Sequence, residues 1–303
     1  MSGRPALSAI ARKQLGIKAS RAALETRLKL KVPAGEAVSV YEAAERLGVE
    51  VRFLDAPSLE GLYLRQAPGQ VVPLIALSSK RPAGRQVWTA AHELGHHVFG
   101  HGDRTDDTHL VGQDESDDPE EVLAHSFAAI FLMPKAAVER GFRVRGFAVS
   151  SPTPAQLFTV AGWLGVGYTT LINHMLWTLR LITEATAKAL LTRKPQKIRA
   201  EIAGEAVTGD LWIVDCHWTG RPVDARVGDV LLVPERTEVA GEVLSARDGP
   251  AGMMIVDVVS PGIGQVIGDG WAVFVRCSKR EYRGRACFRH VEPDDDDEAE
   301  SDA

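Results

Sequence analysis

The chain has 303 residues, of which 45% are hydrophobic, and a formal net charge of −5. This length predicts more than one domain, each large enough to bury a core. No apolar run approaches the roughly 20 residues of a membrane span, and residues 1–17 lack the continuous apolar segment of a secretory signal. We therefore expect a cytoplasmic protein with no membrane partner.

Charge is distributed unevenly along the chain. Residues 294–302 contain seven acids and no base, and removing these seven from the net charge of −5 leaves +2. Residues 293–303 are therefore predicted to be a disordered acidic tail. The three cysteines lie in no zinc-finger spacing and are expected to be reduced structural thiols.

The N-terminal third reads as short helices and strands. A helix is predicted near residues 19–30. A second is predicted in the run 40–49, where Gly48 stands at the position that a helix C-terminus favours, and a strand at 51–54 follows. Two further β-like runs, 62–65 and 71–77, flank a turn at 67–70. Because Pro73 cannot donate a hydrogen bond to a neighbouring strand, the run 71–77 is predicted to be an edge strand.

The next helix, predicted over residues 85–99, contains the candidate metal-binding residues. Val87, Ala91, Leu94 and Val98 recur at helical spacing and define its buried face. His92 and His96 lie one turn apart on a neighbouring stripe, so both imidazoles can point at one metal ion. The sequence from His92 to His96 is HExxH, in which Glu93 is placed to take the proton of the attacking water.

A catalytic zinc site needs a third protein ligand and one open position. The extended motif HExxHxxGxxH would need glycine at 99 and histidine at 102, but the chain has Phe99 and Gly102, so His101 is one position out of phase. A glutamate from a later helix is the other common solution.

That later helix is predicted to begin at Asp118 as N-cap, with Pro119 in its first turn. Helix phase favours Glu121, which shares a stripe with alanines that would let the two helices approach closely. The neighbouring candidates weighed against it are Glu115, Asp117, Glu120 and His125.

The segments VWTAAHELGHHVFGH and EEVLAHSFAAIFLMP resemble the ImmA/IrrE family of zinc metallopeptidases, and the similarity extends over about residues 36–182. The resemblance implies a zincin-like core that holds one zinc ion per chain. It implies His92, His96 and Glu121 as the metal ligands and Glu93 as the catalytic base. The family's usual asparagine is replaced by His125, which could support a ligand from the second shell, compete for the metal or simply pack.

Residues 155–180 contain two apolar-periodic helices separated by residues 164–167, similar to the helix-turn-helix-like segment of that family. A DNA-reading helix would carry polar side chains toward base edges, but residues 168–177 offer only Asn173 and His174. Packing or substrate docking is therefore favoured over DNA binding.

From residue 203 to 292 the chain changes to short β runs, which predict a small sandwich or barrel. These runs are LWIVDC, DVLLVP, MMIVDV, QVIG, WAVFVRC and ACFRHV. Between Arg276 and His290 there are six Lys/Arg and one Glu. A solvated hairpin is favoured here over a nucleic-acid surface in which Tyr282 and Phe288 would contact bases.

We predict an α+β protein made of a zincin-like metallopeptidase core, a helical helix-turn-helix-like segment and a C-terminal all-β domain. The expected segments are an N-terminal helical arm (1–35), the peptidase domain (36–140), the helical segment (141–200), the all-β regulatory or binding domain (203–292) and the acidic tail (293–303).

The predicted function is site-specific, zinc-dependent hydrolysis of a protein partner, with the run 71–77 holding an extended substrate. By the family resemblance, that partner is a helix-turn-helix transcriptional repressor, cleaved to induce a stress or mobile-element response. The alternative is a DNA- or ligand-binding regulator with a structural or vestigial metal site.

Overall fold

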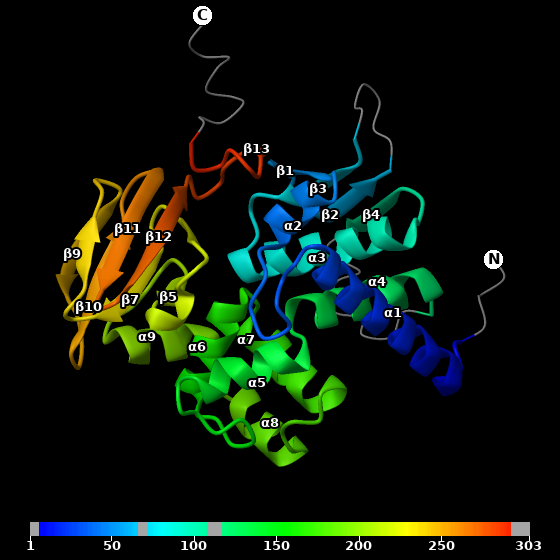
Figure 1. Ribbon diagram of the computed structural model, residues 1–303, viewed down its shortest axis with the longest axis horizontal. Coiled ribbons are helices and arrows are strands. Elements are labelled where there is room, and N and C mark those ends of the chain that lie inside the picture. The colour runs from blue at the N-terminus through cyan, green and yellow to red at the C-terminus, as the bar shows by residue number, and fades with distance from the viewer. Residues whose placement is uncertain (1–5, 66–71, 108–116, 292–303) are drawn as a thin grey trace, which may run out of the picture. The chain divides into compact units, whose positions relative to one another are not determined.

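The computed structural model describes residues 6–65, 72–107 and 117–291, without the side chains of residues 104–107. The expected turn at 67–70 and the acidic tail lie outside the described residues. The fold is mixed α+β and divides into two compact units (Figure 1). Unit 1 comprises residues up to Arg140 together with Arg285–Cys287, and unit 2 comprises Gly141–Gly284 together with the residues from Phe288 onward.

Unit 1 is a five-stranded sheet covered by helices. Its strands are β1 (Glu50–Leu54), β2 (Leu59–Leu64), β3 (Leu74–Ser78), β4 (Arg104–Asp107) and β13 (Gly284–Arg285), in the order β13-β1-β3-β2-β4. β1 and β3 are parallel, whereas β2 is antiparallel to both β3 and β4. The chain therefore returns from near its C-terminal end to supply the strand beside β1.

The prediction that residues 71–77 form an edge strand is wrong. β3 begins at Leu74 and lies between β1 and β2, and all five of its residues are buried. Pro73 precedes the strand and contributes only its carbonyl oxygen, which accepts from the Glu50 amide at 2.9 Å. Its missing N–H is therefore never needed by the sheet.

Four helices of unit 1 form layers on the sheet. They are α1 (Ala9–Lys29), α2 (Val40–Arg46), α3 (Ala83–Phe99) and α4 (Pro119–Leu132). α3 packs on β2 and β3, α4 packs on α3, and α1 packs on α4. α1 starts ten residues earlier than predicted, at Ala9 after the Ser8 N-cap.

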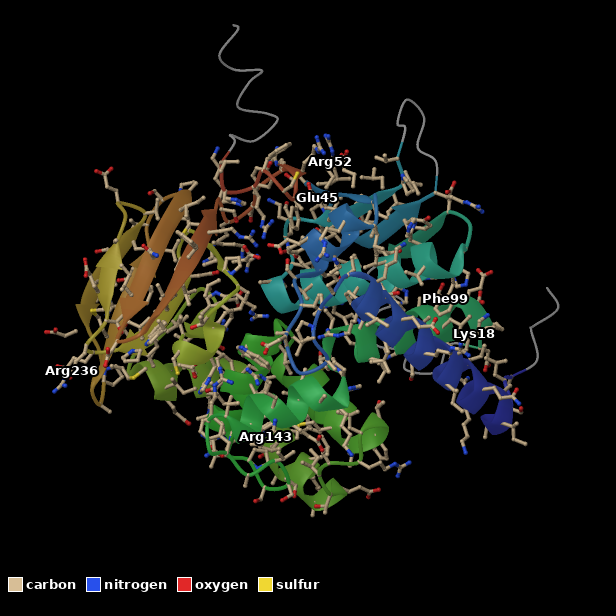
Figure 2. All side chains as sticks on the ribbon, viewed as in Figure 1. Lys18, Glu45, Arg52, Phe99, Arg143 and Arg236 are labelled. Carbon is tan, nitrogen blue, oxygen red and sulfur yellow. The ribbon has the colours of Figure 1, made fainter. Side chains whose placement is uncertain are left out.

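Arg27 fixes α1 in this stack. Its guanidinium is buried and donates to the carbonyl oxygens of Phe131 at 2.7 Å, Pro33 at 2.9 Å and Glu36 at 2.5 Å. Burial lowers the pKa of Arg27 to about 10, which still leaves the side chain charged at neutral pH. Near the middle of the helix, the Lys18 ammonium lies 5.6 Å from the centre of the Phe99 ring (Figure 2).

Helix α5 (Lys135–Arg143) spans the boundary between the units, and unit 2 continues with α6 (Pro154–Leu164) and α7 (Tyr168–Asn173). Gly165, with φ of 75°, ends α6, so the two predicted helices and the break between them are present. α7 runs into a π-helical turn, His174–Thr178, and His174 is buried there. Two further helices follow, α8 (Glu184–Leu191) and α9 (Pro195–Ala203).

The remainder of unit 2 contains two four-stranded sheets, β5-β7-β10-β9 and β6-β12-β11-β8. Their strands are β5 (Leu211–Ile213), β6 (Val223–Arg226), β7 (Val230–Pro234), β8 (Glu238–Ala240), β9 (Leu244–Asp248), β10 (Met253–Val258), β11 (Gly262–Gly268) and β12 (Trp271–Ser278). The core of the first sheet contains Leu211, Leu232 and Ile255, and Phe158 of α6 and Ala203 of α9 pack in the same cluster. The helical and β parts of unit 2 thus share a core.

Residues 286–291 were predicted to form a strand, but they form turns. The predicted basic hairpin is absent from the described chain, because β13 pairs with β1 instead of β12. Basic side chains of this stretch pair with acids of unit 2. Arg276 and Arg289 both contact Asp224, at 2.6 and 2.8 Å, and Tyr282 is buried. The ion pairs offset the charge of Arg276 and Arg289, and the burial of Tyr282 removes one of the two aromatic rings that a nucleic acid would contact.

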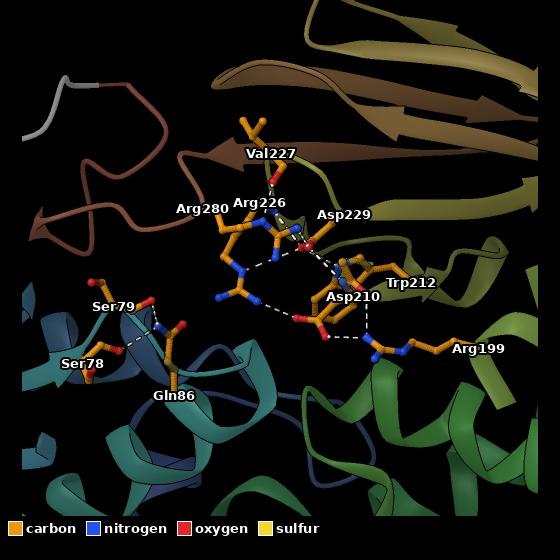
Figure 3. Close-up of polar contacts among 11 residues, drawn as sticks. Ser78, Ser79, Gln86, Arg199, Asp210, Trp212, Arg226, Val227, Asp229 and Arg280 are labelled. Atoms are coloured by element: carbon orange, nitrogen blue, oxygen red, sulfur yellow. Dashed lines mark hydrogen bonds and ion pairs between the residues drawn. The ribbon is translucent and has the colours of Figure 1, made fainter. Parts of the chain in front are cut away.

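Unit 2 also holds a buried network around Asp229, which we call the Asp229 cluster (Figure 3). The Asp229 carboxylate accepts from the amides of Asp210 and Arg226 and from the guanidinium of Arg280. Asp210 in turn pairs with Arg226 and Arg199. Burial raises the pKa of Asp229 despite the nearby Arg226, and the surrounding donors satisfy its oxygens.

One helical stretch, Pro119–Arg143, is long and apolar enough to cross a membrane, and 61% of its apolar window is buried inside the protein. The pair Pro154–Leu164 and Tyr168–Thr178 passes the same test only together and is bent by 100°. Burial in a core accounts for both, since core helices have the same composition.

Candidate metal centre

Helix α3 is bonded to the sheet near its start and is closed by a glycine at its end. Near its start, the buried Gln86 amide donates to the carbonyl oxygens of Ser78 and Ser79 at 3.0 and 3.3 Å, which ties the helix to the end of β3 (Figure 3). At its end, Gly100 adopts a left-handed conformation with φ of 68° and closes the helix, as glycine commonly does. The histidines of the HExxH sequence therefore lie on a fixed segment.

Helix α4 begins where the sequence predicts. Asp118 is its N-cap and accepts from the Glu120 amide at 3.0 Å, and Pro119 occupies the first turn. The helix approaches α3 closely at Gly95, where an added Cβ would lie 3.0 Å from the Ala124 Cα atom and 3.1 Å from its carbonyl oxygen. The small residues at positions 95 and 124 bring Glu121 within reach of the α3 histidines.

Three side chains converge between the two helices. The Nε2 atoms of His92 and His96 are 3.1 Å apart, and the Glu121 carboxylate oxygens lie 3.2 Å from His92 Nε2 and 3.5 Å from His96 Nε2. The ligand atoms of these three residues lie within 4.8 Å of one another, which forms a candidate metal site. The structure thus brings together the three predicted ligands.

These distances fit a tetrahedral zinc ion. With zinc at 2.0–2.1 Å from each nitrogen or oxygen, tetrahedral geometry separates the ligand atoms by about 3.3 Å. The three observed separations fall on either side of that value. Two histidines and a glutamate are also a donor set that catalytic zinc sites use, with the fourth position open.

The electrostatics of Glu121 favour its ionised form. Burial alone would raise the pKa of this carboxyl, but hydrogen bonds and charge interactions with His92 and His96 outweigh burial and lower it. Glu121 is half-buried, whereas His96 is fully buried and His92 nearly so. An anionic oxygen beside two imidazoles is what a divalent cation requires.

Glu93 lies on the side of α3 that faces β2. It is completely buried, and the β2 backbone passes directly over its carboxylate at Gly61. A Cβ added at Gly61 would overlap Thr89 and lie 2.5 Å from Glu93 Oε1. Only glycine lets the strand approach this closely, so residue 61 controls the space in which the predicted base sits.

The other candidates from the sequence lie elsewhere. Asp117 accepts from the Leu7 amide and pairs with Arg12, so it anchors the start of α1. His125 is exposed, and its ring meets Trp88 edge-on with centroids 5.1 Å apart. Neither Glu120 nor His125 belongs to the converging group, and Glu115 lies outside the described residues.

Sequence reasoning missed two residues beside the centre, Gly61 and His101. His101, excluded as a ligand because of its spacing, is buried with its Nδ1 atom 2.9 Å from His96 Nδ1. The signal for His101 was its proximity to the helix end. Gly61 could not have been found, because its role depends on which strand covers α3.

One family model matches part of the chain. Residues 44–145 match the peptidase M78 family, described as the IrrE N-terminal-like domain. No curated protein matches the chain. A solved structure described as a Mycobacterium tuberculosis transcriptional regulator is 14% identical, with a TM-score of 0.32, over 80% of this chain and 74% of that one.

Proposed function

We propose that the chain is a zinc-dependent endopeptidase with a zincin-like core, and the match of residues 44–145 to the IrrE N-terminal-like domain of the peptidase M78 family supports this. The observation that carries this proposal is the convergence of His92, His96 and Glu121 at separations that fit one tetrahedral zinc ion. We also propose a cytoplasmic location, in keeping with the burial of its most apolar helices.

The residues of the proposed centre have different roles in hydrolysis. Zinc bound there would make water acidic and polarise the scissile carbonyl group. Glu93, one residue after the first ligand, takes the proton of the attacking water and passes it to the leaving amine. Gly61 leaves room for the Glu93 carboxylate to adopt this position.

The proposed substrate is a single protein partner, a helix-turn-helix transcriptional repressor, whose cleavage would induce a stress or mobile-element response. The resemblance to ImmA/IrrE peptidases supports this choice. β3 is not proposed to hold the substrate, because it is paired on both sides. DNA reading by α7 and the π-helical turn that follows it is not favoured, because His174 of that turn, one of the two candidate polar side chains, is buried.

The test uses the full chain and, as candidate substrate, any small helix-turn-helix repressor that sequencing finds in the gene beside its own. Purified protein should bind about one zinc ion and cut that repressor at one site, while leaving casein intact. Glu93→Gln should keep the zinc and lose hydrolysis by about 10²–10⁴-fold, the range that general acid–base catalysis contributes.

Two results would refute the proposal. If Glu93→Gln retained full activity, Glu93 would not be the base. If the wild-type protein held zinc but cut no repressor and instead bound DNA or a small ligand, the metal site would be structural and the protein a regulator.

A further inference from the structure

His101 lies directly behind one of the proposed metal ligands. Gly100 turns the chain at the end of α3, and the His101 amide donates to the His96 carbonyl oxygen at 3.0 Å. This turn folds the His101 ring back onto the helix. Its Nδ1 atom then lies 2.9 Å from His96 Nδ1, on the side opposite the ligand atoms.

The surroundings hold the His101 ring in place. The ring is buried and stacks on Phe99, with centroids 5.6 Å apart and planes inclined by 21°. Phe99 itself packs edge-on against Phe127 of α4. The imidazole is therefore clamped between the helix end and the aromatic side chains of the core.

Hydrogen-bond chemistry allows one useful proton arrangement for this pair. A hydrogen bond between two Nδ1 atoms needs one donor and one acceptor. His96 can offer a lone pair at Nε2 only if its proton is on Nδ1, which makes His96 the donor. His101 must then be neutral, accept at Nδ1 and carry its own proton on Nε2.

We propose that His101 is a positioning residue for the metal centre: by accepting from His96 Nδ1–H, it selects the His96 tautomer and ring orientation that present Nε2 toward His92 and Glu121. This inference rests on the zinc site of the proposed function. Outer partners of metal-binding histidines typically change metal affinity 10–100-fold when they are removed.

The experiment measures zinc affinity of the full chain, by competition between metal-free protein and a fluorescent chelator. His101→Leu keeps the approximate volume and removes the acceptor, so zinc affinity should fall 10–100-fold. His101→Asn places an amide oxygen close to the Nδ1 position, so affinity should return to within a few-fold of wild type. The Co²⁺ absorption spectrum should change in the leucine variant and recover in the asparagine variant.

His97 provides the matched control. It follows His96 directly and is half-buried, but its Nδ1 atom pairs with the Tyr63 hydroxyl at 3.0 Å instead of with a ligand. His97→Leu should leave zinc affinity unchanged. Thermal unfolding of the metal-free variants tests whether each protein is folded.

Wild-type zinc affinity in a folded His101→Leu protein would overturn the proposal, as would equal losses in His101→Leu and His97→Leu. Failure of His101→Asn to recover affinity would overturn the role of the acceptor. If the leucine variant does not fold, nitrogen-15 NMR of the zinc-bound wild type decides, since it must find the His96 proton on Nδ1 and the His101 proton on Nε2. Because no readout is hydrolysis, an inactive wild type that binds zinc would refute the peptidase proposal alone.

Discussion

The candidate metal centre of unit 1 and the Asp229 cluster of unit 2 each contain a carboxylate that is at least partly buried, but different groups face the two carboxylates. Around Asp229, backbone amides and the guanidinium of Arg280 donate to the carboxylate oxygens. Around Glu121, the facing groups are the ring nitrogens of two histidines, which are acceptors when they present lone pairs. A buried carboxylate whose oxygens accept hydrogen bonds is already stabilised. Lone pairs that converge on one point repel one another unless a cation binds between them.

The largest effect on zinc binding is expected from a substitution at Glu121. Glu121→Ala should weaken zinc binding by about 100-fold or more, beyond the range seen for supporting residues, because it removes a direct ligand. The same change should lower the unfolding free energy of the metal-free protein by only about 1 kcal/mol, because the contacts with His92 and His96 that it removes are made by a partly exposed carboxylate.

Metal analysis and chelator competition measure the first effect, and urea unfolding measures the second. Glu120→Ala is the matched control, one residue earlier on α4 and outside the converging group, and should be near neutral. An active, zinc-replete Glu121→Ala protein would remove Glu121 from the ligand set.

Asp229→Ala should show the opposite pattern. Loss of this fully buried acid leaves two backbone amides without their acceptor and takes one acceptor from Arg280, and each buried donor left unsatisfied costs about 1–3 kcal/mol. We expect that loss in urea unfolding, with zinc stoichiometry unchanged. Asp248→Ala, at an exposed position on β9, should stay within about 0.5 kcal/mol of wild type.

Gly61→Ala tests the space around the predicted base. The added methyl group would collide with Thr89 and the Glu93 carboxylate, so the base must shift. A displacement of about 1 Å can reduce a rate by about 100-fold, and we expect that reduction in repressor cleavage with zinc affinity retained. Gly102→Ala, where the added carbon has no neighbour within 4 Å, should cleave at the normal rate. Equal rates for the two variants would remove Gly61 from the centre.

The smallest effect is expected at His125. Its ring packs on Trp88 at the surface, and it does not belong to the converging group, so His125→Asn should change zinc affinity by less than about tenfold. Competition titration measures this directly. Loss of zinc from the variant would mean that His125 is a ligand or an essential support.

Local patterns in the sequence predict much of the metal centre. The i, i+4 spacing of His92 and His96 fixes their common stripe on a helix, and Asp118 with Pro119 marks where the second helix starts. Helix phase then separates Glu121 from Glu120. The convergence of the three side chains agrees with these inferences, each of which depends on residues within one or two helical turns.

Features that depend on contacts between residues far apart in the sequence could not be predicted from local patterns. Pro73 suggested an edge strand, but the strand begins one residue later and lies inside the sheet. Residues 286–291 have the alternation of a strand, yet their neighbours are set by the return of the chain to β1. The roles of Gly61 and His101 likewise depend on which segment covers α3 and how its end turns.

The return of the chain to β1 also sets the order in which the protein can be completed during synthesis. The Val51 carbonyl oxygen on β1 accepts from the Ala286 amide at 2.7 Å, from a residue made roughly 235 positions later. At ribosomal rates of about 5–20 residues per second, this edge of the sheet waits about 10–50 s for its partner. A nascent chain carrying an otherwise finished unit 1 therefore exposes an open strand edge, the kind of surface that chaperones cover and that pairs wrongly between chains.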